Sequence, residues 1–298
     1  EPWDRVRRQA LQITEQYRAE ILPDAGPVSV QMKKYIRALC NPQVTTLVCQ
    51  GGPGTGKTFT ASLVGMLMLT AGLATRMQHT KPLVSAGGQS LGFERGSMAD
   101  KLAYWTKPTQ QAAARVAEQQ GIDPEVLTSR VEAFPIDRIR GISIPRGEWM
   151  IADEMQNTYW PLFMCMISRA EVGSKVVICG DVNQSDLSTT SKKPGGMDMI
   201  VKAWDRLRKV AGNDGVAPDD IRRSAEAQSK LVKLRNSFEM VCLEEQYNMR
   251  NPGNTDLTEW AQAVQRGDKV ALTSDETAND WETLCRDVYQ ALQPAGHL

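Results

Sequence analysis

The sequence lacks the residues and runs that mark many metal-binding and membrane-spanning proteins. It contains only two histidines, His79 and His297, and its six cysteines lie far apart without a CxxC pair. A histidine-based metal site is therefore not expected, and the scattered cysteines favour a reduced protein in the cytoplasm. No apolar run approaches the ~18 residues that a transmembrane helix needs, so we expect no membrane partner.

A net charge is absent as well, because 35 Lys and Arg residues balance 35 Asp and Glu residues. The composition thus gives no general electrostatic reason for binding nucleic acid, and any such surface has to be local. The 298 residues are enough for one large α/β domain or two small ones, each with a substantial apolar core.

What the sequence does contain is a glycine-rich run between an apolar stretch, 45–49, and a helical stretch that begins at Phe59. In such a run the glycines let successive backbone N–H groups point inward, Lys57 reaches the outer phosphates and the Thr58 hydroxyl ligates Mg²⁺. The pattern predicts a phosphate-binding loop for a nucleoside triphosphate. The residues expected to bind the nucleotide here are Gly51, Gly52, Pro53, Gly54, Thr55, Gly56, Lys57, Thr58 and Phe59.

Two further apolar stretches end in polar residues that suit the same chemistry. One ends at Asp153, which we expect to hold Mg²⁺, and Glu154, which we expect to polarise the attacking water. The other, 175–179, is followed by a polar turn with Gln184, whose amide can hydrogen-bond the terminal phosphate. Together with Lys57, these side chains form the predicted catalytic set.

Apolar and amphipathic stretches alternate along the chain, and this predicts an α/β protein with a parallel sheet covered by helices on both faces. With the phosphate loop, the expected class is a P-loop NTPase with extra N- and C-terminal helices. We expect a helical extension at 1–27, an ATPase domain at 28–255 and a helical segment at 256–298. Strands are predicted over 45–49, 82–86, 149–152, 175–179 and 238–243, and helices over 4–20 and 30–39.

Several blocks of the sequence together resemble the PhoH family, in order over about 28–187 and weakly over 238–252. Besides the phosphate loop, they are Lys81-Pro82-Leu83-Val84, Leu91-Gly92-Phe93, Ile139-Arg140-Gly141, Asp153-Glu154-Met155-Gln156-Asn157, Gly173-Ser174-Lys175 and Gly180-Asp181-Val182-Asn183-Gln184. The acidic block and the Gly-Asp-x-x-Gln block are the most diagnostic.

The resemblance implies an ATPase similar to the core of superfamily 1 helicases, associated with phosphate starvation in bacteria and also carried by phages. It further implies a RecA-like or helicase-like fold and ring-shaped oligomers, hexamers in the family, that act on RNA or DNA. Gln31 takes the position of an adenine-reading glutamine, and Arg250 that of the arginine after the last strand. We expect Arg250 to reach the nucleotide of a neighbouring subunit, where such an arginine finger stabilises spreading negative charge.

A surface for single-stranded nucleic acid is expected where basic residues stand beside aromatic ones. The candidates are Arg138 and Arg140, ahead of the acidic strand, and Lys101 and Lys107, which bracket Tyr104 and Trp105. An ordinary solvated face is the alternative for these residues. For the whole chain, the alternatives are an assembly module that binds nucleotide with little turnover and a P-loop kinase.

Overall fold

The computed structural model describes residues 1–22, 26–83, 104–187, 193–210 and 236–243. All of them lie in one compact unit, Glu1–Met249. The predicted segment 256–298 lies outside these ranges, so the division of the chain into three parts stays a prediction.

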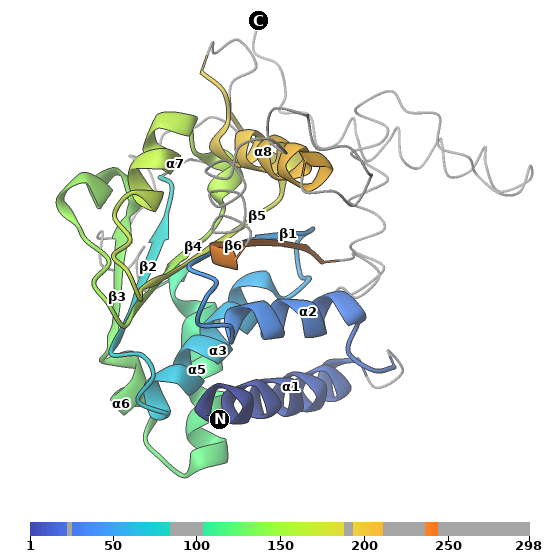
Figure 1. Cartoon of the computed structure of the whole chain (residues 1–298). Helices are drawn as coiled ribbons and strands as arrows, with labels where there is room; N and C mark the ends of the chain where they lie inside the picture. Colours follow the sequence, from blue (N-terminus) through green and yellow to red (C-terminus); the bar gives the residue numbers. More distant parts are fainter. Residues whose placement is uncertain (23–25, 84–103, 188–192, 211–235, 244–298) are drawn as a thin grey trace, which may run out of the picture. The chain divides into compact units, whose positions relative to one another are not determined.

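Six strands form one sheet in the order β3-β2-β4-β5-β1-β6, and every neighbouring pair is parallel (Figure 1). All carboxyl ends of the strands therefore meet at the same edge, where ligands bind in open α/β sheets. The strands are β1 Thr46–Gln50, β2 Arg76–Lys81, β3 Val131–Pro135, β4 Glu148–Ala152, β5 Lys175–Gly180 and β6 Phe238–Cys242.

Helices cover both faces of this sheet, as predicted (Figure 1). On one face lie α1 Pro2–Ile21, α2 Val30–Leu39, α3 Lys57–Thr70, α5 Lys107–Gln120 and α6 Pro124–Thr128, and on the other α7 Trp160–Ile167 and α8 Gly196–Val210. Three short 3-10 turns, η3 Ile136–Gly141, η4 Met155–Asn157 and η5 Val182–Gln184, follow the carboxyl ends of β3, β4 and β5. Within the described ranges, no helix combines the length and the apolar character that crossing a bilayer requires.

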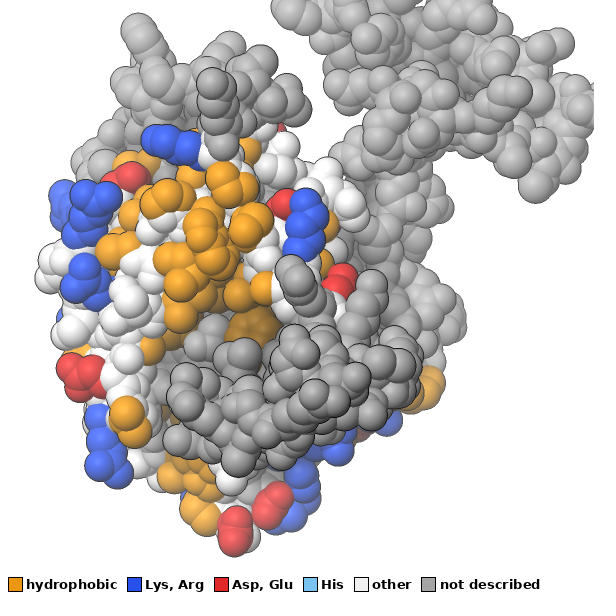
Figure 2. Space-filling model, turned by 45° about the horizontal axis from the view of Figure 1, so that its top comes forward, with side chains coloured by type: hydrophobic (Ala, Val, Ile, Leu, Met, Phe, Trp, Pro, Cys, Tyr) orange, Lys and Arg blue, Asp and Glu red, His pale blue; other side chains and the backbone are white. Residues whose placement is uncertain are grey.

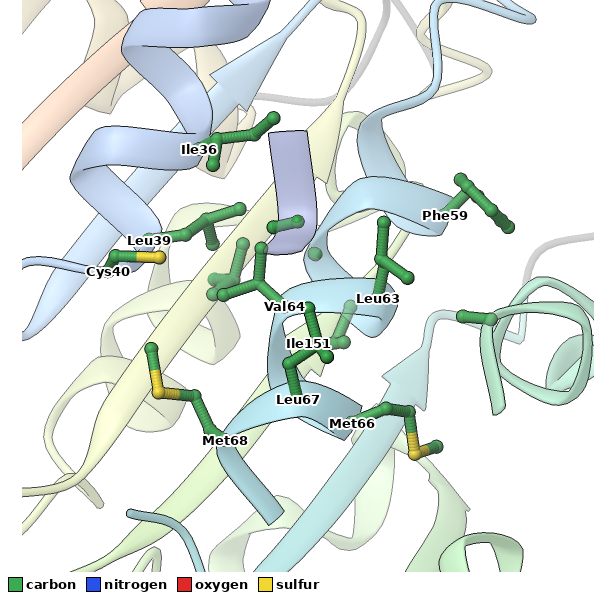
Figure 3. Packing of buried hydrophobic residues seen from close by; sticks show 14 of the residues in the cluster. Ile36, Leu39, Cys40, Phe59, Leu63, Val64, Met66, Leu67, Met68 and Ile151 are labelled. Atoms are coloured by element: carbon green, nitrogen blue, oxygen red, sulfur yellow. The ribbon is translucent and has the colours of Figure 1, made fainter. Parts of the chain in front are cut away.

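Helix α3 is the centre of the larger core. It is buried from Phe59 to Leu69 without interruption, because α1, α2 and α5 surround it and the sheet lies behind it. Figure 3 shows its side chains among Ile36 and Leu39 of α2 and Ile151 of β4. A helix that is apolar on all sides is fixed in place by its packing, so the loop at its N-terminus has a rigid support.

The opposite face of the sheet has a smaller core, centred on Phe163 and Met166 of α7 and Met197 of α8. Figure 2 shows the molecule with the top of Figure 1 turned toward the viewer. Hydrophobic side chains form a continuous band on this surface. Met164 of α7 is among the exposed large hydrophobic residues of the described chain.

Two strand predictions need correction. The strand expected at 82–86 is wrong in its described part, since β2 is Arg76–Lys81 and residues 82–83 belong to no element. Strand β3 was not predicted at all. Strand β2 has Met77 as its one apolar residue and buries the polar residues Gln78, His79 and Thr80. Strand β3 has five residues, is interrupted by Glu132 and ends at Pro135. A search for apolar runs therefore passes over both strands.

The N-terminal helix α1 belongs to the same compact unit and is packed on α3. Val6, Ala10 and Ile13 join the larger core, and the Tyr17 ring stacks on Phe59 with their centroids 4.6 Å apart. Arg115 of α5 forms an ion pair with Glu20 and lies over the Tyr17 ring, which ties the end of α1 to α5. This helix thus supports the residue that directly follows the phosphate loop.

Candidate nucleotide-binding site

The predicted phosphate loop lies between the end of β1 and the start of α3. Gly54 and Gly56 have φ values of 79° and 87°, a left-handed conformation that glycine adopts at little cost. The Thr55 hydroxyl closes the turn by donating to the Gly52 carbonyl at 2.8 Å. Gly56 is the N-cap of α3 and supplies no side-chain cap, so the first N–H groups of the helix remain available to an anion.

Lys57 is the first residue of α3, which begins two residues before the predicted helical stretch. Its ammonium donates to the carbonyl of Gly52 at 2.7 Å and to that of Gly51. The positive charge is therefore held inside the curve of the loop, next to the N-terminus of the helix. Both features attract phosphate oxygens.

The phosphate loop and the acidic strand meet as predicted. The Thr58 hydroxyl donates to the Asp153 carboxylate at 2.9 Å, across 95 positions of sequence. Asp153 itself is fixed at the strand end, because its backbone N–H donates to the Thr80 carbonyl at 2.9 Å and its carboxylate accepts from the Glu154 N–H at 3.0 Å. A hydroxyl and a carboxylate oxygen thus lie together at the carboxyl edge of the sheet.

Glu154 adopts a left-handed backbone conformation with φ of 54°, which no other non-glycine residue of the described chain shows. Such a conformation costs on the order of 1 kcal/mol and is found most often at functional sites. One carboxylate oxygen accepts from Gln156 Nε2 at 2.7 Å, and the other lies 3.7 Å from Lys81 Nζ. The side chain is 42% exposed, so it is held firmly yet open to a reactant.

Gln184 lies in η5, directly beyond the end of β5. Because β5 lies between β4 and β1 in the sheet, this turn is at the same edge as Glu154 and the phosphate loop. Asp181 begins the turn by accepting from the Asn183 N–H at 3.0 Å, and the Gln184 N–H donates to the Asp181 carbonyl at 3.0 Å. The structure thus brings the three predicted catalytic elements together.

Behind the phosphate loop lies a buried hydroxyl that sequence reasoning missed. Tyr35 of α2 donates to the Lys57 carbonyl at 3.1 Å, and its oxygen lies 3.7 Å from Cys179 Sγ. Burial raises the pKa of Tyr35 well above its usual range and that of Cys179 to about 12. Both groups therefore keep their protons, and Tyr35 remains a donor that links α2 to the first residue of α3.

His79 is buried in β2 on the side of α5, with Nδ1 3.5 Å from the Thr109 hydroxyl. Burial lowers its pKa, and the nearby Asp153 carboxylate opposes that shift. The neutral imidazole thus belongs to the packing between β2 and α5.

Two more residues predicted to bind the nucleotide, Gln31 and Phe59, lie on different helices. Gln31 is half-buried in the first turn of α2, after Ser29, whose hydroxyl caps the helix by accepting from the Met32 N–H. Phe59 is 7% exposed, and its ring is stacked on that of Tyr17.

The predicted nucleic-acid residues do not form one cluster. Arg138 and Arg140 are exposed on η3, which packs against α7, whereas Lys107 is exposed at the start of α5, which packs against α3 on the other face. Lys107 Nζ lies 4.4 Å from the centre of the Tyr104 ring, and Tyr104 is 67% exposed. Lys101 and Arg250 lie outside the described residues.

Comparison with known proteins matches residues 26–233 to the family model described as PhoH-like protein. A PhoH-like protein of Synechocystis sp. is 31% identical over 162 residues, which cover 54% of this chain and 48% of that protein. A PhoH-like protein of Bacillus subtilis is 31% identical over 177 residues, which cover 57% of this chain and 54% of that protein. The chain thus spans about half the length of these relatives.

Among solved structures, the Pif1 helicase from Candida albicans aligns with 86% of this chain and 47% of its own, at 14% identity and a TM-score of 0.38. This likeness is too distant to add to the assignment. The family match covers most of the compact unit and includes the phosphate loop, the acidic strand and the turn after β5. The chain therefore belongs to the PhoH family.

Proposed function

We propose that this protein binds ATP together with Mg²⁺ and hydrolyses it. The observation that carries the proposal is the contact between Thr58 and Asp153, with Glu154 as the next residue. Hydroxyl and carboxylate oxygens are the ligands that Mg²⁺ prefers, so these two side chains fit the ion and would hold it. When bound, the ion neutralises charge on the phosphate oxygens.

Residues of this chain bind the phosphates and activate the water. The loop N–H groups and the Lys57 ammonium bind the phosphates, and the β5 turn presents Gln184 at the same edge. Glu154, held at both carboxylate oxygens, orients the attacking water and accepts its proton. A carboxylate dedicated to water favours hydrolysis over transfer to a second substrate, which is the reason to prefer an ATPase to a kinase.

We also propose that the protein works as a ring-shaped oligomer, hexameric as the family resemblance implied, and acts on single-stranded RNA or DNA. Two exposed features support a nucleic-acid surface. Arg138 and Arg140 offer guanidinium groups for phosphates, and Tyr104 offers a ring on which a base can stack, with Lys107 beside it. Arg250 is the proposed finger toward a neighbouring subunit.

The test is a steady-state assay of phosphate release with Lys57→Ala and Glu154→Gln as variants. Lys57→Ala should lose tight nucleotide binding. Glu154→Gln should bind ATP as the wild type does and hydrolyse it roughly 10²- to 10⁴-fold more slowly, the range typical of a lost general base. Unchanged turnover in Glu154→Gln would remove this residue from its role, and a phosphorylated small molecule in place of free phosphate would identify a kinase.

Rates with and without single-stranded RNA and DNA then test the partner, on protein whose mass in solution is measured with and without nucleotide. Stimulation by one polymer supports action on it. Oligomers that form with ATP but show negligible turnover with either polymer would instead identify an assembly module.

A further inference from the structure

Gln156 and Asn157 follow Glu154 in the acidic block, and the proposed chemistry has so far used neither of them. Gln156 is buried, with only 4% of its surface exposed. Its amide nitrogen donates to the Glu154 carboxylate at 2.7 Å, and its amide oxygen accepts from the Asp181 N–H at 3.2 Å. One side chain thus connects the residue proposed as the base with the first residue after β5.

The chemistry of the two partners determines the orientation of this amide. A carboxylate only accepts hydrogen bonds and a backbone N–H only donates one, so the nitrogen has to face Glu154 and the oxygen has to face Asp181. Neither an apolar side chain nor an ionised carboxylate satisfies both partners. Glutamine is therefore the residue type that this position requires.

Three more hydrogen bonds join the same two segments. The Ser185 hydroxyl donates to the Gln156 carbonyl at 3.1 Å, the Asp186 N–H donates to Asn157 Oδ1 at 2.7 Å, and Asn157 Nδ2 donates to the Asp186 carboxylate at 3.3 Å. The turn that carries Gln184 is thus enclosed between Asp181 and Ser185, both of which are bonded to Gln156.

Gly180 shows how closely the two segments approach each other. A Cβ atom at this position would lie 2.6 Å from Gln156 Oε1 and 2.5 Å from Met197 Sδ, so a side chain there would have to displace the Gln156 amide and the Met197 side chain. The absence of a side chain lets the end of β5 reach the amide. The contact is therefore part of the packed structure and not an incidental surface bond.

We propose that Gln156 is a positioning residue that fixes the Glu154 carboxylate and ties it to the turn carrying Gln184, so that base and phosphate-reading turn move as one unit. This inference rests on the proposed function, because it assumes that Glu154 activates water. It adds a route by which a change at the terminal phosphate, read by the β5 turn, reaches the base.

The first test compares Gln156→Met with Gln78→Met. Gln78 is a matched control, because it is also 4% exposed and its Nε2 also donates to a glutamate carboxylate, that of Glu148, at 2.7 Å. Glu148 is the first residue of β4, at the opposite end of that strand from Glu154. We expect Gln156→Met to lower kcat roughly 30- to 100-fold with KM for ATP within about threefold, as displacement of a catalytic group does, and Gln78→Met to keep kcat.

The second test is the pH dependence of kcat in Gln156→Glu. When the introduced carboxyl is protonated, it donates to Glu154 and accepts from Asp181 as the glutamine does; when it is ionised, two carboxylates face each other. The rate of Gln156→Glu relative to that of the wild type should therefore rise as the pH is lowered from 8 to 6. If Gln156 had a purely structural role, the pH profiles of kcat for Gln156→Glu and for the wild type would be parallel.

Parallel profiles, an unchanged kcat in Gln156→Met or an equal loss of kcat in Gln78→Met would each overturn the inference while leaving ATP hydrolysis intact. Retained turnover in Glu154→Gln would instead overturn the assignment of the base, and the inference would fall with it. Circular dichroism and thermal unfolding of each variant show whether it is folded before its rate is compared.

Discussion

Lys175 offers a direct test of how the site is held in place, because its side chain is hydrogen-bonded to the end of α2, the helix that carries Gln31 and Tyr35. It is the first residue of β5 and is 4% exposed. Its ammonium donates to the carbonyl oxygens of Ala38 at 3.3 Å and Leu39 at 2.7 Å, which end α2, and to that of Asn41 at 2.8 Å, just beyond the helix. A buried cation thus caps the C-terminus of this helix.

We predict that Lys175→Met destabilises the protein by about 2 to 3 kcal/mol at pH 6. Methionine fills a similar volume but leaves three carbonyl oxygens without this donor, at a cost of roughly 1 kcal/mol each. The variant no longer buries a charged group, and this offsets part of the loss in stability. Because Tyr35 links α2 to Lys57, nucleotide affinity should fall together with stability.

The same variant predicts a pH dependence. Burial lowers the pKa of Lys175 from its ordinary 10.5 to about 7. Between these two values the unfolded chain holds a proton that the folded protein has released, so the free energy of unfolding of the wild type rises with pH by up to about 1.4 kcal/mol per pH unit. Lys175→Met lacks this contribution, and the stability difference should widen from pH 7 upward.

The assay is urea unfolding at pH 6, 7, 8 and 9. The control is Lys34→Met, which replaces a lysine of α2, the helix that Lys175 caps. Lys34 is 44% exposed and lies 3.5 Å from Glu239, so its replacement should cost less than about 1 kcal/mol at every pH. A loss below 1 kcal/mol for Lys175→Met at pH 6 would refute the capping role. A constant difference from pH 6 to pH 9 would show that the folded protein keeps the proton on this lysine.

Three further predictions concern the site. Tyr35→Phe removes the donor to the Lys57 carbonyl and should weaken nucleotide binding about three- to tenfold, the effect of roughly 1 kcal/mol, as measured by isothermal titration calorimetry. An unchanged affinity would show that α3 positions Lys57 without this bond. Thr58→Val keeps the shape of the side chain but loses the hydroxyl that meets Asp153, so binding of ATP should lose its dependence on Mg²⁺ while binding in EDTA stays the same. Equal losses in the presence and absence of Mg²⁺ would contradict that role. Arg250→Ala subunits mixed with wild type should lower ATPase activity more steeply than their share of the mixture, because each would impair a neighbour; a strictly proportional decline would argue against a finger that acts between subunits.

The parts of the site that could be predicted are those formed by residues adjacent in sequence. The phosphate loop requires glycines at φ values that other residues avoid, and its strand and helix flank it directly, so its position follows from local pattern. Asp153 and Glu154 could be placed for the same reason, since parallel strands bring their carboxyl ends to one edge whatever their order.

Other parts could not be predicted, because their signal is a contact between distant segments. Strand β2 buries three polar residues, Gln78, His79 and Thr80, and is a strand because β3 and β4 lie on either side of it. Since its end was misplaced, Lys81 was not foreseen as a neighbour of Glu154. The motif block does contain Gln156, yet nothing local shows that its amide oxygen accepts from a residue 25 positions away.

The sequence alone determined three local pieces: a loop that curves around phosphates, an acidic strand end and a polar turn. Each is encoded by a few consecutive residues, and together they predict the kind of chemistry. The tertiary structure decided how these pieces are held, through the amide of Gln156, the hydroxyl of Tyr35 and the ammonium of Lys175. The physical reason is that a buried polar group has to find a partner, and the fold, not the neighbouring residues, determines which partner lies within reach.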